Sequence, residues 1–229
     1  MTKNAKIAIS VVAAVLIIDQ VFKIWIKTHF MLGEEVEVLG SWFRLHFVEN
    51  NGMAFGMQIS GHSWGKLALS IFRLVAVGLI GYYLYKICKR KGGVGLVACV
   101  SLILAGAVGN IIDSVFYGVL FSSSVGQVAE FLPADGGYGS WLQGRVVDML
   151  FFPLIDTRWP DWVPFFGGDH LLFFRPVFNI ADSAICCGIA ALILFQREAL
   201  SRDLGQNTDQ KEENTAPNVV ANNKVEKSE

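Results

Sequence analysis

The chain has 229 residues, of which 53% are hydrophobic and only 17% are charged. Soluble domains carry about 25% charged residues, and the deficit here falls in long apolar blocks, which indicates a membrane protein with several spans. The formal net charge of −1 gives no support for nucleic-acid binding. The four cysteines lie in or beside apolar runs without a CxxC or His/Cys cluster, so we expect neither a disulfide framework nor a metal site.

The first apolar run covers residues 7–26 and is long enough to span a membrane. No small-x-small cleavage site follows it, so we interpret it as a transmembrane helix and not as a removable signal peptide. Asp19 and Lys23 within it are four residues apart and can pair along one helix face. Such a pair can be purely structural or can lie beside an active site, and the sequence leaves both open.

Residues 28–65 have mixed polarity. Two segments, 34–38 and 42–48, alternate with a period of about two, which predicts short strands. Asn50–Asn51–Gly52 is a tight-turn signal. We therefore expect a small sheet on the outer membrane surface, a β-cradle over about residues 34–60, with aromatic side chains at the interface.

Residues 67–88 and 94–112 are the second and third predicted spans. Four basic residues, Lys86, Lys89, Arg90 and Lys91, lie at the end of the second run and in the short loop that follows it. The positive-inside rule places this loop in the cytoplasm, together with the amino terminus. With a fourth span, the carboxyl terminus is cytoplasmic too. We assign Arg73, inside the second span, to a structural or lipid-headgroup contact in preference to catalysis.

The last apolar run, Val177–Phe195, holds Asp182 as its one charged residue. A carboxylate at the centre of a membrane helix costs ~2.5–3.5 kcal/mol, so a chain that keeps one usually needs it. Asn179 and Asp182 are three residues apart, and Asn110 and Asp113 of the third run repeat this spacing. Two helices that each present Asn-x-x-Asp towards the outer side favour one shared polar site.

Asp148 is the second candidate carboxylate. The apolar stretch that follows it, residues 149–154, could reach the same depth as Asp182. Two neighbouring carboxyl groups in a low dielectric share a proton, so that one activates water while the other polarises a carbonyl group. This arrangement hydrolyses peptides, and Asn110 and Asn179 could orient the carboxylates or hold the substrate backbone. The rest of segment 122–176 is expected to form half-submerged loops or short amphipathic helices.

Five short motifs follow one another in order between residues 7 and 196. They are Asp19–Gln20 with Lys23, Asn50-x-Gly52-x-Ala54–Phe55, Gly109–Asn110-x-x-Asp113, Val146–Val147–Asp148 and Phe178–Asn179-x-Ala181–Asp182. With these motifs the chain resembles the bacterial lipoprotein signal peptidases (signal peptidase II). Any one motif is weak, but the ordered set is highly specific.

The resemblance implies an intramembrane aspartic endopeptidase with catalytic Asp148 and Asp182. Such an enzyme removes the signal peptide of a diacylglyceryl-modified prolipoprotein on the amino side of the lipidated Cys, without a metal or organic cofactor. It implies partners in the prolipoprotein and membrane lipid, a multi-pass protein of the bacterial inner membrane, and an active site near the periplasmic face. We expect a monomer. The supporting or substrate-binding residues would be Asp19, Lys23, Asn50, Gly52, Gly109, Asn110, Asp113, Arg145, Asn179 and Ala181.

The expected fold is therefore all-α in the membrane, with four transmembrane helices, an outer β-cradle and a periplasmic insertion. Residues 1–196 would form the peptidase domain and residues 197–229 a disordered cytoplasmic tail. The chain departs from the family at Ser114, where an Arg is usual; Arg145 or Arg73 could supply that charge. Residues 121–143 are an insertion that bears on the substrate entrance.

Two other classes of protein fit the composition. A proton- or ion-coupled transporter would use intramembrane carboxylates as a relay and would move an ion across sealed vesicles. However, four spans are few, and the carboxylates gather towards one face. A structural or assembly protein would keep its activity in cells after both aspartates were neutralised.

Overall fold

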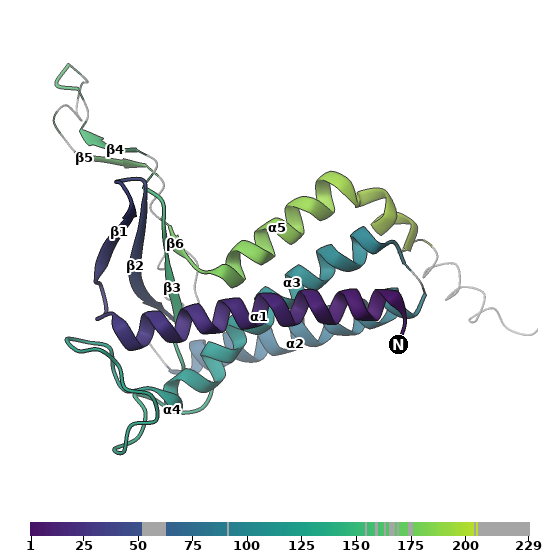
Figure 1. The fold of residues 1–229 in the computed structure, drawn as a ribbon, viewed down its shortest axis with the longest axis horizontal. Helices are drawn as coiled ribbons and strands as arrows, with labels where there is room; N and C mark the ends of the chain where they lie inside the picture. The colour runs from purple at the N-terminus through teal and green to yellow at the C-terminus, as the bar shows by residue number, and fades with distance from the viewer. Residues whose placement is uncertain are drawn as a thin grey trace, which may run out of the picture.

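The computed structural model describes residues 1–51, 63–90, 92–153, 155–158, 160–162, 164, 168, 170–173, 176–203 and 205. Its long helices are α1 (Lys3–His29), α2 (Ser63–Lys89), α3 (Val94–Ile112) and α5 (Ile180–Phe195). A π-helical turn, η2 (Asp113–Tyr117), and the short α4 (Gly118–Leu120) prolong α3. The helices form an elongated body, and a sheet stands across one end of it (Figure 1).

Three helical segments of the described chain are long and apolar enough to cross a membrane: Lys3–His29, Ser70–Lys89 and Val94–Leu120. A fourth span is possible if α5 is taken together with Arg197–Asp203, to which it is bent by 83°. This confirms the expected fold class, a helical membrane protein with a small β element. Helical structure continues past the predicted domain boundary at 196, because Ala199 and Leu200 pack against the apolar core shared by α2 and α3.

Four strands form an antiparallel sheet in the order β1-β2-β3-β6. They are β1 (Glu35–Leu39), β2 (Phe43–Asn50), β3 (Val146–Phe151) and β6 (Val177–Phe178). A separate pair, β4 (Ile155–Arg158) and β5 (His170–Phe173), projects beyond the sheet (Figure 1). The predicted cradle strands are present as β1 and β2. The rest of the predicted cradle, including Gly52 and its turn, lies outside the described residues.

The expectation of loops or short helices over the rest of segment 122–176 is wrong where β4 and β5 lie, and the stretch around Asp148 also forms a strand, β3. Nearly every side chain of β3 is buried, on both faces of the sheet. A strand buried on both faces shows no alternation of polar and apolar residues, so a period-two search misses it. The strand matters because it carries Asp148.

The core at the sheet end joins α1, η2 and the sheet. Ile26, Phe47, Tyr117 and Met149 are buried there together. Along the helices, α3 and α5 approach closely at Gly106, where an added Cβ would lie 2.2 Å from the Ala181 carbonyl oxygen. Small residues at such crossings let membrane helices pack backbone to backbone. This packing fixes where α5 begins relative to α3.

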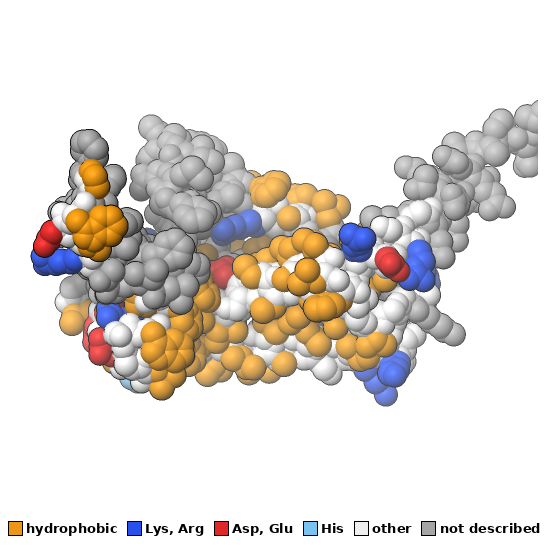
Figure 2. Space-filling model, turned by 90° about the horizontal axis from the view of Figure 1, so that it is seen from above, with side chains coloured by type: hydrophobic (Ala, Val, Ile, Leu, Met, Phe, Trp, Pro, Cys, Tyr) orange, Lys and Arg blue, Asp and Glu red, His pale blue; other side chains and the backbone are white. Residues whose placement is uncertain are grey.

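Side-chain types are segregated along the molecule. Figure 2 shows hydrophobic side chains over the middle of the helical body and most charged side chains towards its two ends. Large apolar side chains are exposed on several helices, among them Ile17 on α1, Phe72 on α2 and Leu194 on α5. A wide exposed apolar belt is what a membrane-embedded surface requires.

Candidate active site

Helix α5 begins at a capping box formed by Asn179 and Asp182. The Asn179 Oδ1 accepts a hydrogen bond of 2.8 Å from the Asp182 backbone N–H, and the Asp182 Oδ2 accepts one of 3.4 Å from the Asn179 N–H. Asn is among the best N-cap residues, and a reciprocal acidic partner three residues later completes the motif. Asp182 therefore stands in the first helical turn, where the helix dipole favours a negative charge.

Asp148 lies at the centre of β3 and is 3% exposed. Its Oδ1 accepts a hydrogen bond of 2.7 Å from Asn179 Nδ2, and its Oδ2 accepts one of 3.3 Å from Asn50 Nδ2. The pairing of β3 with β2 and with β6 brings these donors to the carboxylate. Asn179 thus contacts both candidate aspartates, one through its side-chain amide and the other through its backbone.

Asn110, on α3, joins this pair from the helical side. Its Nδ2 donates a hydrogen bond of 2.7 Å to Asp182 Oδ1, and its Oδ1 accepts one of 3.1 Å from Asn179 Nδ2. The two Asn-x-x-Asp motifs of the sequence therefore do meet in space. Each asparagine orients the aspartate of another element.

A second layer lies beneath these residues and is organised by Lys23, which is fully buried. Its Nζ is 2.9 Å from Asp19 Oδ2, 2.8 Å from Asp113 Oδ2 and 2.9 Å from Asn110 Oδ1. A buried ion is tolerated when opposite charges and hydrogen bonds compensate its lost hydration. The Asp19–Lys23 pair is therefore a buried ion pair that also lies beside the candidate site, so the two roles considered from the sequence do not exclude each other.

The two carboxylates that hold Lys23 also hold the backbone. Asp19 Oδ1 accepts a hydrogen bond of 2.8 Å from the Ala181 N–H, and Asp113 Oδ2 accepts one of 3.2 Å from the Val147 N–H. These bonds tie α1 to the start of α5, and η2 to the strand that carries Asp148. Ala181 is thus fully buried in the site and contributes its backbone N–H as the hydrogen-bond donor to Asp19.

Gly109 makes room for this arrangement. An added Cβ there would lie 2.8 Å from Asp19 Oδ2 and 3.2 Å from the Ala181 Cβ. Its carbonyl oxygen also accepts a hydrogen bond of 3.2 Å from Gln20 Nε2. Gln20 also donates a hydrogen bond of 3.0 Å to Asp113 Oδ1 and accepts one of 3.1 Å from the Tyr117 hydroxyl. It is a site residue missing from the predicted set, and the only sign of it in the sequence is its position directly after Asp19.

The environment of Asp148 favours its protonated form. Burial, and next the negative charge of Asp182, raise the pKa of Asp148 to about 7, against the lowering effect of the amides of Asn50 and Asn179. Desolvation and a like charge both disfavour ionisation of a carboxyl group. Two neighbouring acids with unequal protonation are the pairing that general acid–base catalysis needs.

The remaining predicted residues lie elsewhere. Arg145 forms an ion pair of 2.9 Å with Glu49. Arg73 lies on α2. Ser114 turns inward and donates to the Asn110 carbonyl oxygen at 2.9 Å.

No cluster of three or more His, Cys, Asp or Glu side chains that could hold a metal ion occurs within the described ranges. The carboxylates of the site are instead engaged by the amides of asparagine and glutamine, by backbone N–H groups and by Lys23. The chemistry that this donor set supports is acid–base chemistry at a carboxyl pair.

Comparison with known proteins gives the following similarities. A family model described as signal peptidase (SPase) II matches residues 11–197. The lipoprotein signal peptidase of Porphyromonas gingivalis is 49% identical over 192 residues, 83% of each chain, and that of Amoebophilus asiaticus is 36% identical over 205 residues, 88% of this chain and 82% of the other. Two solved structures of bacterial membrane enzymes match with TM-scores of 0.53 and 0.54, at 25% and 26% identity. They cover 85% and 82% of this chain and 90% of each other chain.

Proposed function

The chain belongs to the signal peptidase II family, and on this premise we propose that Asp148 and Asp182 are the catalytic pair of this peptidase. Membership makes the chain an aspartic membrane peptidase that processes prolipoproteins, and a transporter is not supported. The proposal concerns the residues that perform the reaction, the bond that is cleaved and the orientation in the membrane.

The observation that carries the proposal is the position of Asn179. Its side-chain amide is 2.7 Å from Asp148 Oδ1, and its backbone N–H is 3.4 Å from Asp182 Oδ2. One residue can contact both carboxylates in this way only if they face the same small volume. Fixed positions matter because a general acid and a general base must reach the same scissile bond.

The reaction would begin with one proton on the pair, held by Asp148, because burial and the charge of Asp182 raise the pKa of Asp148 to about 7. Asp182 takes a proton from water while the water oxygen attacks the peptide carbonyl carbon, and Asp148 donates its proton to the carbonyl oxygen. The tetrahedral intermediate then collapses. Its C–N bond breaks as Asp182 gives its proton to the leaving amine, and one hydroxyl of the intermediate returns a proton to Asp148 as the new carboxyl group forms.

The surrounding residues would hold the two carboxylates in fixed orientations by hydrogen bonds. Asn50 and Asn179 hold the two oxygens of Asp148, while Asn110 holds Asp182. The Asp19–Lys23–Asp113 layer would hold the helices and β3 in place beneath them. Gly109 and Ala181 would serve by their small size, and we place Gly52 in the substrate-binding turn on the resemblance alone.

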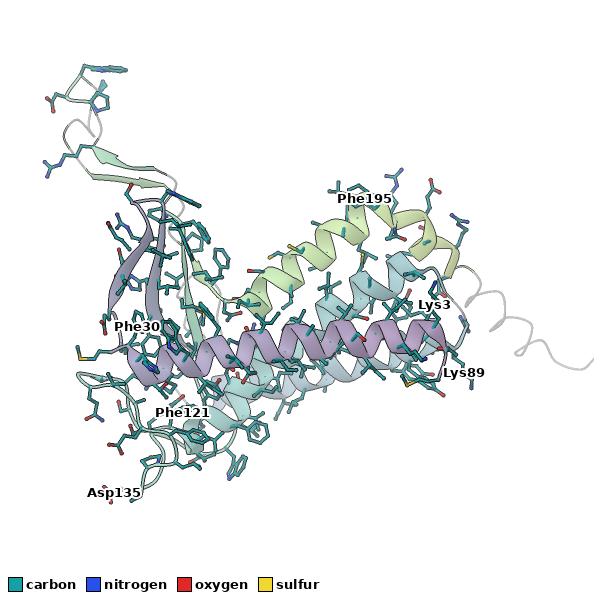
Figure 3. The ribbon with its side chains drawn as sticks, viewed as in Figure 1. Lys3, Phe30, Lys89, Phe121, Asp135 and Phe195 are labelled. Carbon is teal, nitrogen blue, oxygen red and sulfur yellow. The ribbon has the colours of Figure 1, made fainter. Side chains whose placement is uncertain are left out.

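The bond cleaved would be the one on the amino side of the lipidated Cys of a diacylglyceryl-modified prolipoprotein. We place the protein in the bacterial inner membrane as a monomer, with both termini in the cytoplasm. The basic residues support this orientation, because Lys3 and Lys89 lie at the end of the helical body opposite to Phe30 and Phe121 (Figure 3). The active site would then lie at the periplasmic face, where a membrane-anchored substrate presents its acylated Cys and where lipid contacts the helices.

The test is cleavage of two forms of one substrate by the purified full-length protein in lipid. A diacylglyceryl-modified prolipoprotein and its unmodified counterpart are offered at equal concentration, and the products are sequenced by mass spectrometry. We expect cleavage of the modified form alone, directly before the lipidated Cys. Equal cleavage of both forms, or a cut elsewhere, would refute the proposed bond and lipid requirement.

A further inference from the structure

A second buried cluster of charged residues lies on the face of β3 opposite to Asp148. Successive side chains of a strand point to opposite faces, so Asp148 and Val147 face opposite ways. Val147 pairs with Glu49 in the sheet and is buried in the core with Phe47. Glu49 and its partners Lys27 and Arg145, here called the Lys27–Glu49–Arg145 cluster, therefore lie behind Asp148.

The cluster is tightly connected. Lys27 is 0% exposed and Glu49 is 2% exposed, and their side chains form an ion pair through Glu49 Oε1. The other oxygen, Oε2, is 2.9 Å from Arg145 Nη1, whose side chain is 37% exposed. Each oxygen of Glu49 thus holds a different cation, one from α1 and one from the residue just before β3.

The insertion of residues 121–143 closes this cluster. Ser124 Oγ lies 2.9 Å from Lys27 Nζ and 3.3 Å from Glu49 Oε1. The ring of Tyr138 lies 4.9 Å from Lys27 Nζ and 5.3 Å from the Arg145 guanidinium carbon, and its hydroxyl accepts a hydrogen bond of 2.7 Å from the Arg145 N–H. The ring of Phe121 is a second aromatic face, 5.5 Å from Lys27 Nζ. Aromatic faces favour cations where water is excluded.

The cluster is adjacent in sequence to the groups that hold Asp148. Glu49 precedes Asn50, the donor to Asp148 Oδ2, and Arg145 stands three residues before Asp148. The ladder between β2 and β3 shows an irregularity between Leu45 and Val48, immediately before this stretch. Because backbone pairing is interrupted there, the register of β2 against β3 is less firmly set by the backbone, and ion pairs between side chains can help to hold it.

We propose that the Lys27–Glu49–Arg145 cluster, closed by the 121–143 insertion, is a positioning device that fixes β2 and β3 against each other and thereby holds Asp148 and Asn50 in reacting geometry. None of the three residues contacts the carboxyl pair in the described structure. They act through the strands that they join. The inference rests on the proposed catalytic function of Asp148.

The test compares kcat and KM of the full-length protein in lipid with a diacylglyceryl-modified prolipoprotein. Glu49→Gln and Arg145→Gln are expected to lower kcat on the order of 10- to 100-fold, because a displacement near 1 Å of a catalytic group costs about that much. KM should stay within about twofold, because a residue that acts only by positioning the strands affects the rate and not substrate binding. Arg145→Lys keeps the charge and one donor, so it should recover most of the lost rate.

The matched control is Glu35→Gln. Glu35 belongs to the same sheet and pairs with Arg44 at 2.9 Å, but on the β1 side, away from β3. Its kcat should equal that of the wild type. Because Arg145 is partly exposed, its variants test the proposal even if Glu49→Gln does not fold. Wild-type kcat in Arg145→Gln beside an inactive Asp148→Asn would overturn this inference alone, whereas full activity of Asp148→Asn would overturn the proposed function as well.

Discussion

Asn179 caps helix α5 and, with the same side chain, donates a hydrogen bond of 2.7 Å to Asp148 on strand β3. The local signal that starts the helix is therefore also a contact of the site. Fold and site share one residue here, and substitutions at this position can separate the two roles.

Asn179→Ser and Asn179→Ala form such a pair of variants. Serine retains an N-cap acceptor, so its thermal stability should stay within a few tenths of a kcal/mol, whereas alanine should lose about 1 kcal/mol. Both lose the amide that reaches Asp148, so both should show a similar fall in kcat, on the order of 10-fold or more. Thermal unfolding and prolipoprotein cleavage measure the two effects. A serine variant with full activity would mean that the contact to Asp148 has no role in the reaction.

The pH dependence of cleavage should show an alkaline limb. The pKa of Asp148 is about 7, raised by burial and by Asp182, so the pair loses its remaining proton as the pH rises past that value. The general acid is then absent, and kcat should fall tenfold per pH unit at high pH. A kcat that stays constant from pH 6 to pH 9 would contradict this.

The same raised pKa has a consequence for stability. The folded state binds the proton of Asp148 more tightly than the unfolded chain does, so ionisation of this group opposes folding. Its contribution to stability should fall as the pH rises from about 4 to about 7. Asp148→Asn removes the titrating group, so its stability should depend less on pH in that window than that of the wild type.

Gly109→Ala and Gly106→Ala should destabilise the helical packing. An added Cβ at Gly106 would lie 2.2 Å from the Ala181 carbonyl oxygen, and one at Gly109 would lie 2.8 Å from Asp19 Oδ2. Overpacking of this kind costs about 1–3 kcal/mol. Gly78→Ala on α2 is the control, because nothing lies within 4 Å of its added Cβ. That variant should unfold at an unchanged or higher temperature; equal destabilisation in all three would contradict the packing argument.

Lys23→Met should be strongly destabilising. It leaves Asp19 and Asp113 buried without the cation that lies within 3 Å of both. Removing one partner of a buried ion pair costs about 3–5 kcal/mol. Lys6→Met, on the same helix but exposed, should change stability by less than about 0.5 kcal/mol. Chemical unfolding in detergent compares the two, and similar values would show that Lys23 is not a structural ion.

Much of the fold follows from the sequence alone. The long helices were predictable because apolar runs with basic ends report membrane spans directly. The meeting of Asn110 with Asp182 was also predictable, since polar groups in membrane helices face one another. Strand β3 was not, because it is buried on both faces and so lacks alternation.

Contacts between residues of distant segments also could not be predicted from the sequence. No residue pattern indicates that Arg145 pairs with Glu49, which is 96 residues away, or that Tyr138 lies over Lys27. Such contacts depend on how the insertion folds back on the sheet. The extension of α3 by the π-helical turn η2, which carries Asp113 inward, likewise has no periodic signature.

The most direct test of the account is cleavage of a diacylglyceryl-modified prolipoprotein by Asp148→Asn and Asp182→Asn, with Asp135→Asn as control. Asp135 is an exposed residue of the insertion (Figure 3). The carboxylates of Asp148 and Asp182 both accept hydrogen bonds from Asn179. Both site variants should be folded and inactive, with kcat reduced by at least about 10³-fold, and the control should cleave at the wild-type rate. Wild-type cleavage by either folded site variant would show that Asp148 and Asp182 are not the catalytic pair.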